Sequence, residues 1–208
     1  MKLVVLGANG RTGQHVVRNA IDRGETVTAI TRSDAKRPAI EHENLRVEIG
    51  DPCDPQFLSN VFQDQDAVIS TLGGRMPTKI ATAIYWKSAD AIAEAAGNTG
   101  LEKIVVTSSA LLFPPQRLFD KALIAIVRNI VQSATRMENR LSTAKLTVDV
   151  ARCGFLTDAS DTTYRAEQGI LPKNGSTVSR LSLAHFLIDR VHTPSTGFQV
   201  YGVSAPVS

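Results

Sequence analysis

The feature that most constrains the fold is a set of three glycines that follows a short apolar run. Residues 3–6 are Leu-Val-Val-Leu, and Gly7, Gly10 and Gly13 come directly afterwards, where a segment of helical periodicity begins. A strand that enters a helix through the spacing G-x-x-G-x-x-G is typical of a loop that holds the pyrophosphate of a dinucleotide. The alternative is a plain strand-to-helix turn. We predict a dinucleotide loop with contacts from Gly7, Asn9, Gly10, Arg11, Thr12 and Gly13.

The rest of the chain alternates short runs rich in valine and isoleucine with longer segments of helical periodicity. Most runs are apolar at consecutive positions, which indicates strands covered on both faces, as in a parallel sheet between two helix layers. We predict the α/β class, with a single Rossmann-type doubly wound, mainly parallel sheet, helices on both faces, and one domain over residues 1–208. The predicted strands cover residues 3–6, 26–31, 45–49, 67–71, 104–107, 146–150 and 198–203, and the predicted helices cover residues 13–23, 56–63, 82–98, 121–143 and 182–191.

Composition argues against several classes of function. The 23 Lys and Arg residues nearly balance the 20 Asp and Glu residues and are spread along the chain, so we expect no nucleic-acid partner. The two cysteines, Cys53 and Cys153, are too far apart for a usual metal-ligand spacing, and the four histidines are scattered, so we expect no metal site. The apolar run at residues 3–6 is too short for a signal peptide or a membrane span, and we expect a cytoplasmic protein without membrane contact.

The end of the second predicted strand should indicate which dinucleotide binds. An acidic residue about twenty residues after the glycine loop would accept a hydrogen bond from the ribose 2′-OH of NAD. Arg32 and Ser33 stand there instead, and a guanidinium with a hydroxyl suits a 2′-phosphate. We therefore predict NADP(H) as the cofactor, with weaker binding of NAD(H). Arg11 would add a second cation, or it is a solvated residue at the start of the helix.

The other strand ends should complete the cleft, because ligands of open α/β sheets lie beyond the carboxyl ends of the strands. For each of these segments the alternative is that it merely ends a strand. The predicted cofactor contacts are Asp51 and Pro52 after the third strand, Leu72, Gly73, Gly74 and Arg75 after the fourth, Thr107 and Ser108 at the fifth, and Arg152 and Cys153 at the sixth.

Several segments carry a resemblance to a known family: Leu-Gly-Ala-Asn-Gly-Arg-Thr-Gly from Leu6, Ile-Gly-Asp-Pro from Ile49, Ser-Thr-Leu-Gly-Gly-Arg from Ser70 and Thr-Ser-Ser-Ala-Leu-Leu-Phe from Thr107. The chain resembles the atypical short-chain dehydrogenases, and within them the flavin reductase and biliverdin-IXβ reductase (NmrA-like) family. The resemblance implies an NADPH-dependent reductase that passes hydride to a small-molecule acceptor, a flavin or a linear tetrapyrrole. It also implies that Ser109 is the catalytic residue near the hydride-transfer site and that Arg75 helps to hold the cofactor phosphates. We expect a monomer or a weak homodimer.

The sequence departs from this family, and from the ordinary short-chain dehydrogenases, at two places. Mammalian biliverdin-IXβ enzymes have Pro-Pro-His where this chain has Arg-Cys-Gly at residues 152–154, so no histidine carries over. Tyr85, Tyr164 and Tyr201 each lack a lysine four residues later, so there is no Tyr-x-x-x-Lys pair to act as a base for alcohol oxidation. Hydride transfer to a flavin or tetrapyrrole depends less on such a base, since solvent can supply the proton.

Two other functions stay open. A non-catalytic NADP(H)-binding regulator of the NmrA-like type would keep the cofactor site without a working active site, and a sugar-nucleotide epimerase relative would normally carry the missing Tyr-Lys pair.

Three further interpretations are structural. Tyr85 and Trp86 pack or cap the helix over residues 82–98, or the loop before them roofs the cofactor. Phe113 and Pro114-Pro115 form a wall of the acceptor cleft, and the apolar stretch from Leu118 to Val131 is a core face or a partner surface.

Overall fold

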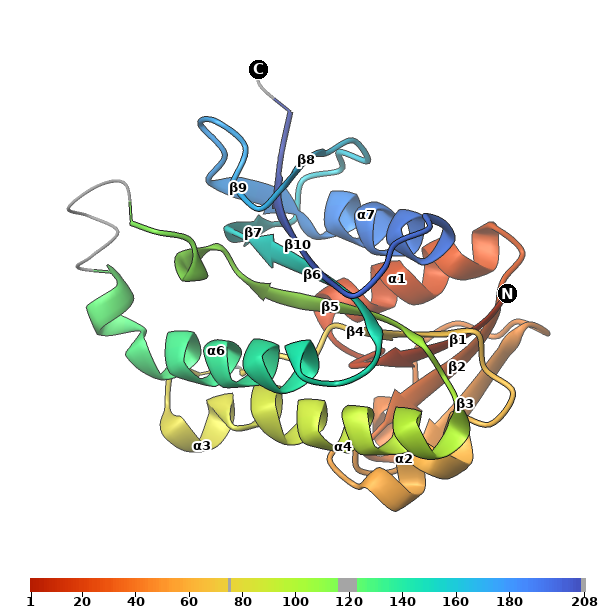
Figure 1. Ribbon diagram of the computed structural model, residues 1–208. Helices are drawn as coiled ribbons and strands as arrows, with labels where there is room; N and C mark the ends of the chain where they lie inside the picture. Colours follow the sequence, from red (N-terminus) through yellow and green to blue (C-terminus); the bar gives the residue numbers. More distant parts are fainter. Residues whose placement is uncertain (75, 116–122, 207–208) are drawn as a thin grey trace.

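The structure is a computed structural model that describes residues 1–74, 76–115 and 123–206. Its centre is an eight-stranded sheet with the order β3-β2-β1-β4-β5-β6-β10-β8 (Figure 1). Every neighbouring pair is parallel except β10 and β8. The strands are β1 (Lys2–Leu6), β2 (Thr26–Thr31), β3 (Leu45–Ile49), β4 (Ala67–Ser70), β5 (Lys103–Ser109), β6 (Thr147–Cys153), β8 (Arg165–Gln168) and β10 (Phe198–Ser204).

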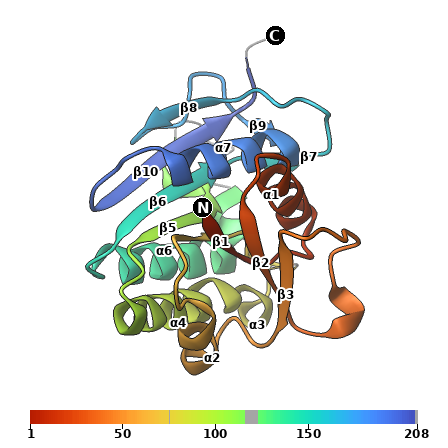
Figure 2. The same ribbon diagram turned by 90° about the vertical axis from the view of Figure 1, so that its right-hand side faces the viewer.

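Helices cover both faces of this sheet, as the two views show (Figures 1 and 2). One face carries α1 (Arg11–Asp22) against α7 (Arg180–His192), and the other carries α2 (Pro55–Val61), α4 (Ile84–Thr99) and α6 (Arg128–Ser142). The short helix α3 (Lys79–Thr82) precedes α4, while the 3-10 turns η1 (Asp34–Lys36) and η2 (Ala110–Leu112) follow β2 and β5. The predicted doubly wound Rossmann-type fold is confirmed.

The apolar strands explain why the sheet is buried on both faces. Leu3 and Val5 pack with the α1 and α7 residues, whereas Val4 and Leu6 pack with the α4 and α6 residues, and all four are fully buried. Because strand side chains alternate between faces, consecutive apolar residues serve two cores at once. The positions of these four side chains show why this run has no polar alternation.

The main differences from the predicted element boundaries concern two helices and two strands. The helix expected over residues 82–98 is α4, and the separate short helix α3 precedes it, with Ala83 between the two. Of the helix expected over residues 121–143, residues 121–122 lie outside the described residues, and a turn at Val127 precedes α6. Strands β5 and β6 continue past their predicted ends to Ser109 and Cys153. Their last residues are polar or small, but the pairing of Ser108 with Arg152 and of Ser109 with Cys153 continues the ladder.

A second, two-stranded sheet was not predicted. It pairs β7 (Phe155–Thr157) with β9 (Thr177–Ser179) in parallel, just beyond the end of β6. Both strands have three residues, and the nearby β8 has the sequence Arg-Ala-Glu-Gln, so neither length nor apolar alternation gave a signal. This small sheet lies between β6 and α7 in the chain and extends the molecule at the end where β6 stops (Figure 1).

No helix within the described ranges is long and apolar enough to cross a membrane.

Candidate functional site

The glycine loop lies between β1 and α1 and is braced by the end of β4. Gly7 has a φ of +79°, a conformation that favours glycine, and a Cβ added there would lie 2.9 Å from Thr71 Oγ1. The Gly10 N–H donates to the Gly7 carbonyl over 2.8 Å and closes the turn. The Thr71 hydroxyl lies 3.2 Å from the Leu6 carbonyl and 3.3 Å from that of Gly7. These contacts form the tight turn that the spacing of the glycines predicts.

Gly13 brings the first turn of α1 against this loop. A Cβ on Gly13 would lie 2.1 Å from the Gly7 carbonyl oxygen, so only glycine allows this approach. Gly10 is the N-cap residue of α1, and no side chain caps the helix among the described residues. The first backbone N–H groups of α1 therefore remain available, and together with the positive end of the helix dipole they form a site suited to phosphate.

Most of the other predicted contacts lie along the same edge of the sheet. The parallel pairing of β1 with β2 and β4, of β4 with β5 and of β5 with β6 brings the carboxyl ends of these strands together. Arg75 lies outside the described residues. The predicted residues at this edge, apart from the glycine loop, are Arg32, Ser33, Asp51, Pro52, Leu72, Gly73, Gly74, Thr107, Ser109 and Cys153.

The β2 and β3 ends carry side chains of opposite charge. Arg32 is exposed directly after β2, and Asp51, which follows β3, accepts a hydrogen bond from the Cys53 backbone N–H over 2.9 Å. Burial and, after it, the nearby Asp51 raise the pKa of the Cys53 thiol to about 11, although Lys87 and Arg32 oppose the shift. Arg32 and Lys87 thus both act on this corner of the sheet, where Cys53 remains a neutral thiol.

Ser109 occupies the end of β5 with its hydroxyl tied to the following turn. Its Oγ accepts the Leu111 backbone N–H over 3.3 Å, so the hydroxyl proton is free to be donated elsewhere. Val105 packs on the α1 and α7 face, and strand alternation places Thr107 and Ser109 on that face too. Cys153 also lies there, its thiol directed to the Ser108 carbonyl at 3.3 Å, and burial raises its pKa to about 12. This thiol stays protonated and is no nucleophile at neutral pH.

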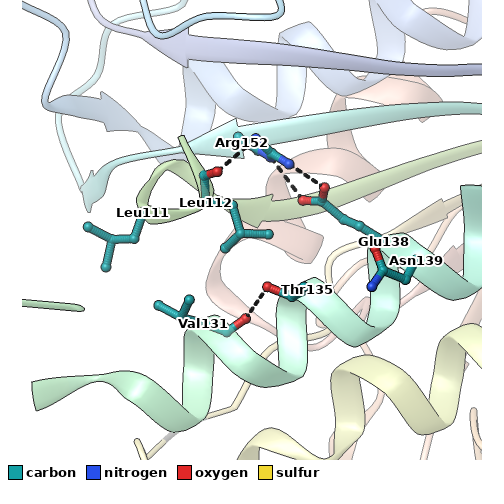
Figure 3. Close-up of a pocket in the computed structure, with 7 residues that line it drawn as sticks. All are labelled: Leu111, Leu112, Val131, Thr135, Glu138, Asn139 and Arg152. Atoms are coloured by element: carbon teal, nitrogen blue, oxygen red, sulfur yellow. Dashed lines mark hydrogen bonds and ion pairs between the residues drawn. The ribbon is translucent and has the colours of Figure 1, made fainter. Parts of the chain in front are cut away.

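Ser108 and Arg152 do not join this group, because their side chains lie on the opposite face, beside α6. The Ser108 hydroxyl donates to Glu138 Oε1 over 2.6 Å, and two Arg152 nitrogens bind the same carboxylate, as Figure 3 shows. Glu138 carried no sequence signal beyond its place on a predicted helix. The pairing of Ser108 with Arg152 across β5 and β6 would have pointed to a shared partner.

Tyr85 reaches the candidate site although its sequence pattern favoured packing. Its hydroxyl would lie 3.2 Å from a Cβ on Gly73, at the loop that follows β4. Burial, with a smaller contribution from nearby Cys153, raises the Tyr85 pKa to about 12. The ring also packs against the core on the α4 face. Tyr85 is therefore a neutral hydrogen-bond donor at the carboxyl edge, as well as a packing residue.

Asp158 joins the glycine loop to the region after β7. It forms ion pairs with Arg11, in the first turn of α1, and with Arg180 Nη1 at 2.6 Å. Arg180 is largely buried at the start of α7, whereas Arg11 and Asp158 are exposed. The predicted second cation of the loop is thus paired with an acid that no motif had indicated.

Gly154 explains why no histidine can follow Cys153. A Cβ at this position would lie 2.2 Å from the Ser176 carbonyl oxygen, and the Phe155 N–H donates to that same oxygen over 2.8 Å. The two backbone segments begin the pairing of β7 with β9. Any side chain at residue 154 would separate them.

Two further predictions concern metal ligands and the apolar stretch from Leu118 to Val131. No three His, Cys, Asp or Glu side chains gather in the described part of the chain, and the expected lack of a metal stays a prediction. Residues 118–122 of the stretch Leu118 to Val131 lie outside the described residues. Of the rest, Ile126 is 74% exposed and the others are at least partly exposed, so both interpretations, core face and partner surface, stay open.

Comparison with known proteins connects this geometry to a family. A family model described as NAD(P)H-binding matches residues 7–194. The photosystem II assembly factor Ycf39 of Synechocystis sp. is 29% identical over 123 residues, which are 58% of this chain and 38% of Ycf39, so the match spans well under half of that relative.

Two solved structures share the fold over nearly their full length. A short-chain dehydrogenase/reductase of Veillonella parvula, solved in complex with NADP, has a TM-score of 0.81 and 20% identity, covering 99% of this chain and 94% of its own. The anaerobillin reductase ChuY of Escherichia coli O157:H7 has a TM-score of 0.78 and 19% identity, covering 100% and 98%. The family match covers most of the sequence and includes the glycine loop, so this chain belongs to the NAD(P)H-binding family.

Proposed function

We propose that this protein is an NADPH-dependent reductase that passes hydride to a flavin or a linear tetrapyrrole. The observation that carries the proposal is the uncapped N-terminus of α1, which follows the glycine loop at the carboxyl edge where Ser109 also lies. Membership of the NAD(P)H-binding family supports the cofactor class. The solved anaerobillin reductase of the same fold supports a reductase.

Arg32 and Ser33 support NADP(H) rather than NAD(H). They stand after β2 where an acid would bind the 2′-OH, and Arg32 is exposed and free of any ion pair to a described residue. A 2′-phosphate would gain charge-assisted hydrogen bonds from the guanidinium and the hydroxyl. The Veillonella structure of the same fold holds NADP.

The residues at the nicotinamide end suit alignment rather than proton abstraction. The bound dinucleotide would supply the hydride. Ser109 keeps a donor proton because its oxygen accepts the Leu111 N–H, and it would orient the nicotinamide amide or the acceptor. Tyr85 is a second neutral donor, since burial raises its pKa to about 12. Neither residue is a base at neutral pH, which fits an acceptor that takes its proton from solvent.

NADPH oxidation followed by absorbance, with FMN, FAD and biliverdin offered separately and NADH as the paired control, tests the proposal. We expect saturable turnover with at least one acceptor and a preference for NADPH. Ser109→Ala should lower turnover by roughly tenfold or more while changing NADPH affinity less than about threefold, because it removes one oriented donor. Ser142→Ala is the matched control, since that exposed hydroxyl contacts only Asn139 of its own helix.

The outcomes separate the proposal from its alternative. Tight NADPH binding without turnover on any of the three acceptors would contradict the reductase and favour the non-catalytic NADP(H)-binding regulator. Equal loss of NADPH affinity and turnover in Ser109→Ala would make Ser109 a binding residue.

A further inference from the structure

A buried ion pair lies behind Ser109 on the α6 face of the sheet. Arg152 Nη2 binds Glu138 Oε2 at 2.7 Å and Arg152 Nε binds Glu138 Oε1 at 3.1 Å, so the pair is bidentate (Figure 3). The Glu138 side chain is 6% exposed and that of Arg152 is 17% exposed. A buried ion pair often contributes no more to stability than apolar residues of similar size, so stability alone does not explain why this pair is present.

The pair joins four elements that meet around the end of β5. Glu138 extends from α6 and accepts the Ser108 hydroxyl of β5 over 2.6 Å. Arg152, on β6, donates through Nη1 to the Leu112 carbonyl of η2 over 3.1 Å. Its guanidinium also lies 4.8 Å from the centre of the Phe113 ring. One guanidinium therefore contacts α6, η2 and the residue that follows η2.

These contacts determine where Ser109 and the segment after it lie. Ser109 is next to the anchored Ser108, and its hydroxyl caps η2 through Leu111. The segment Ala110–Phe113 is held at one end by this cap and at the other by Arg152. Because Phe113 is the predicted wall of the acceptor cleft, the same pair sets both the wall and the hydroxyl beside the hydride-transfer site.

An open pocket beside η2 leaves room for this segment to move. About 250 Å³ of space lies between η2 and α6, lined by Leu111, Leu112, Val131, Thr135, Glu138, Asn139 and Arg152 (Figure 3). Well-packed neighbours would hold a segment in place without polar contacts, but here the space allows η2 to move toward α6. Among the described residues, the hydrogen bond from Arg152 Nη1 to the Leu112 carbonyl is the polar contact that reaches η2 from this side.

We propose that Arg152 and Glu138 are positioning residues, which fix the acceptor-side wall Ala110–Phe113 and the orientation of Ser109. This role rests on the proposed reductase function of the same site. The glycine loop follows β1, whereas the ion pair lies beside β5 and β6. Replacing the pair should therefore affect use of the acceptor far more than binding of NADPH. Arginine is required because lysine cannot donate to Glu138 in a bidentate manner and reach the Leu112 carbonyl as well.

The test compares Arg152→Lys with Arg140→Lys. Arg140 lies on α6 and forms a partly exposed pair with Asp90 at 3.3 Å, so its replacement controls for an Arg-to-Lys change in the same region. Hydrogen exchange of the Leu111 and Phe113 amides reports the order of the wall, since these N–H groups bind Ser109 Oγ and the Ala110 carbonyl. Acceptor kcat/KM and NADPH Kd report its effect on function.

We expect faster exchange of both amides in Arg152→Lys, a fall in acceptor kcat/KM of roughly tenfold or more, and an NADPH Kd within about twofold of wild type, because small misplacements of reacting groups lower rates steeply. Arg140→Lys should match wild type. Unchanged exchange, unchanged kcat/KM, or an equal loss of NADPH affinity would each overturn the positioning role.

A second variant and the exchange measurement cover the cases in which Arg152→Lys does not fold or the wild type shows no turnover. If Arg152→Lys does not fold, the double variant Arg152→Met with Glu138→Leu replaces the pair by apolar side chains, and wild-type kcat/KM in that variant would equally refute the proposal. If wild type shows no turnover, the proposed reductase function fails, and the exchange rates alone then decide whether the pair orders the wall.

Discussion

Replacing Gly13 by alanine tests the close contact between α1 and the glycine loop. The added Cβ would lie 2.1 Å from the Gly7 carbonyl oxygen, about 1.3 Å short of the 3.4 Å at which ordinary van der Waals contact begins. The atom it meets belongs to the backbone, so α1 or the loop must shift. Gly97 offers the matched control, because it lies in α4, is exposed, and has nothing within 4 Å of its added Cβ.

The two substitutions should change stability in opposite directions. Overpacking costs about 1–3 kcal/mol, and alanine in place of a helical glycine contributes about 0.5–1 kcal/mol in return. We therefore expect Gly13→Ala to lose about 1–2 kcal/mol of the free energy of unfolding and Gly97→Ala to gain about 0.5–1 kcal/mol. A protein of this size should show melting temperatures that differ by roughly 3–12 °C between the two variants.

Urea unfolding and NADPH titration of both variants check this reasoning. Gly13→Ala should also weaken NADPH binding, because the shift displaces the α1 N–H groups from their place beside the loop, while Gly97→Ala should bind as wild type. Equal changes in stability for the two variants, or an unaltered NADPH Kd in Gly13→Ala, would refute the close contact.

Three further predictions address the rest of the site and one partly buried histidine of α7. Arg32→Asp should weaken NADPH binding by about tenfold to a hundredfold through loss of charge-assisted hydrogen bonds, with NADH changed far less; calorimetric titration measures both, and an unchanged preference would remove the 2′-phosphate assignment. Tyr85→Phe should lower turnover without moving the pH profile between pH 6 and 9, because the Tyr85 pKa is about 12 and the phenol stays neutral there; a displaced profile would contradict this. Burial, with Arg23 nearby, lowers the pKa of His185 below its usual 6.5. The unfolded chain therefore binds this proton more readily, and stability falls as pH drops through 6.5 toward the lower folded value. His185→Gln should lose less stability than wild type between pH 7.5 and pH 5 in urea unfolding, and an equal loss would count against the assignment.

The sequence was most informative where local chemistry decides the structure. Gly7 and Gly13 predict the loop because a positive φ and a close helix approach each exclude side chains. The consecutive apolar residues of β1 predict a covered parallel sheet because each face needs its own core. Both inferences depend on residues near one another in the chain, so spacing alone was enough.

Contacts between distant residues could not be predicted in this way. The ends of β5 and β6 were placed too early because Ser108 and Arg152 are polar. In the structure the buried Glu138, which lies 30 residues from Ser108 and 14 from Arg152, binds both side chains. The ion pair of Asp158 with Arg11 joins residues far apart in the sequence, so only the structure reveals it, where Asp158 directly follows β7. The closeness of Tyr85 to Gly73 could not be predicted either, because it depends on the break at Ala83 that determines where α4 begins.

The place of β10 in the sheet has a consequence for how the chain is made. Residues 198–204 are the last described strand, yet they lie between β6 and β8 and pair with both. Until these residues have been synthesised, β6, which includes the apolar Val148 and Val150, presents an open edge. A nascent chain that stops before Phe198 would leave that edge uncovered and prone to aggregate, so completion of the sheet has to await synthesis of residues 198–204.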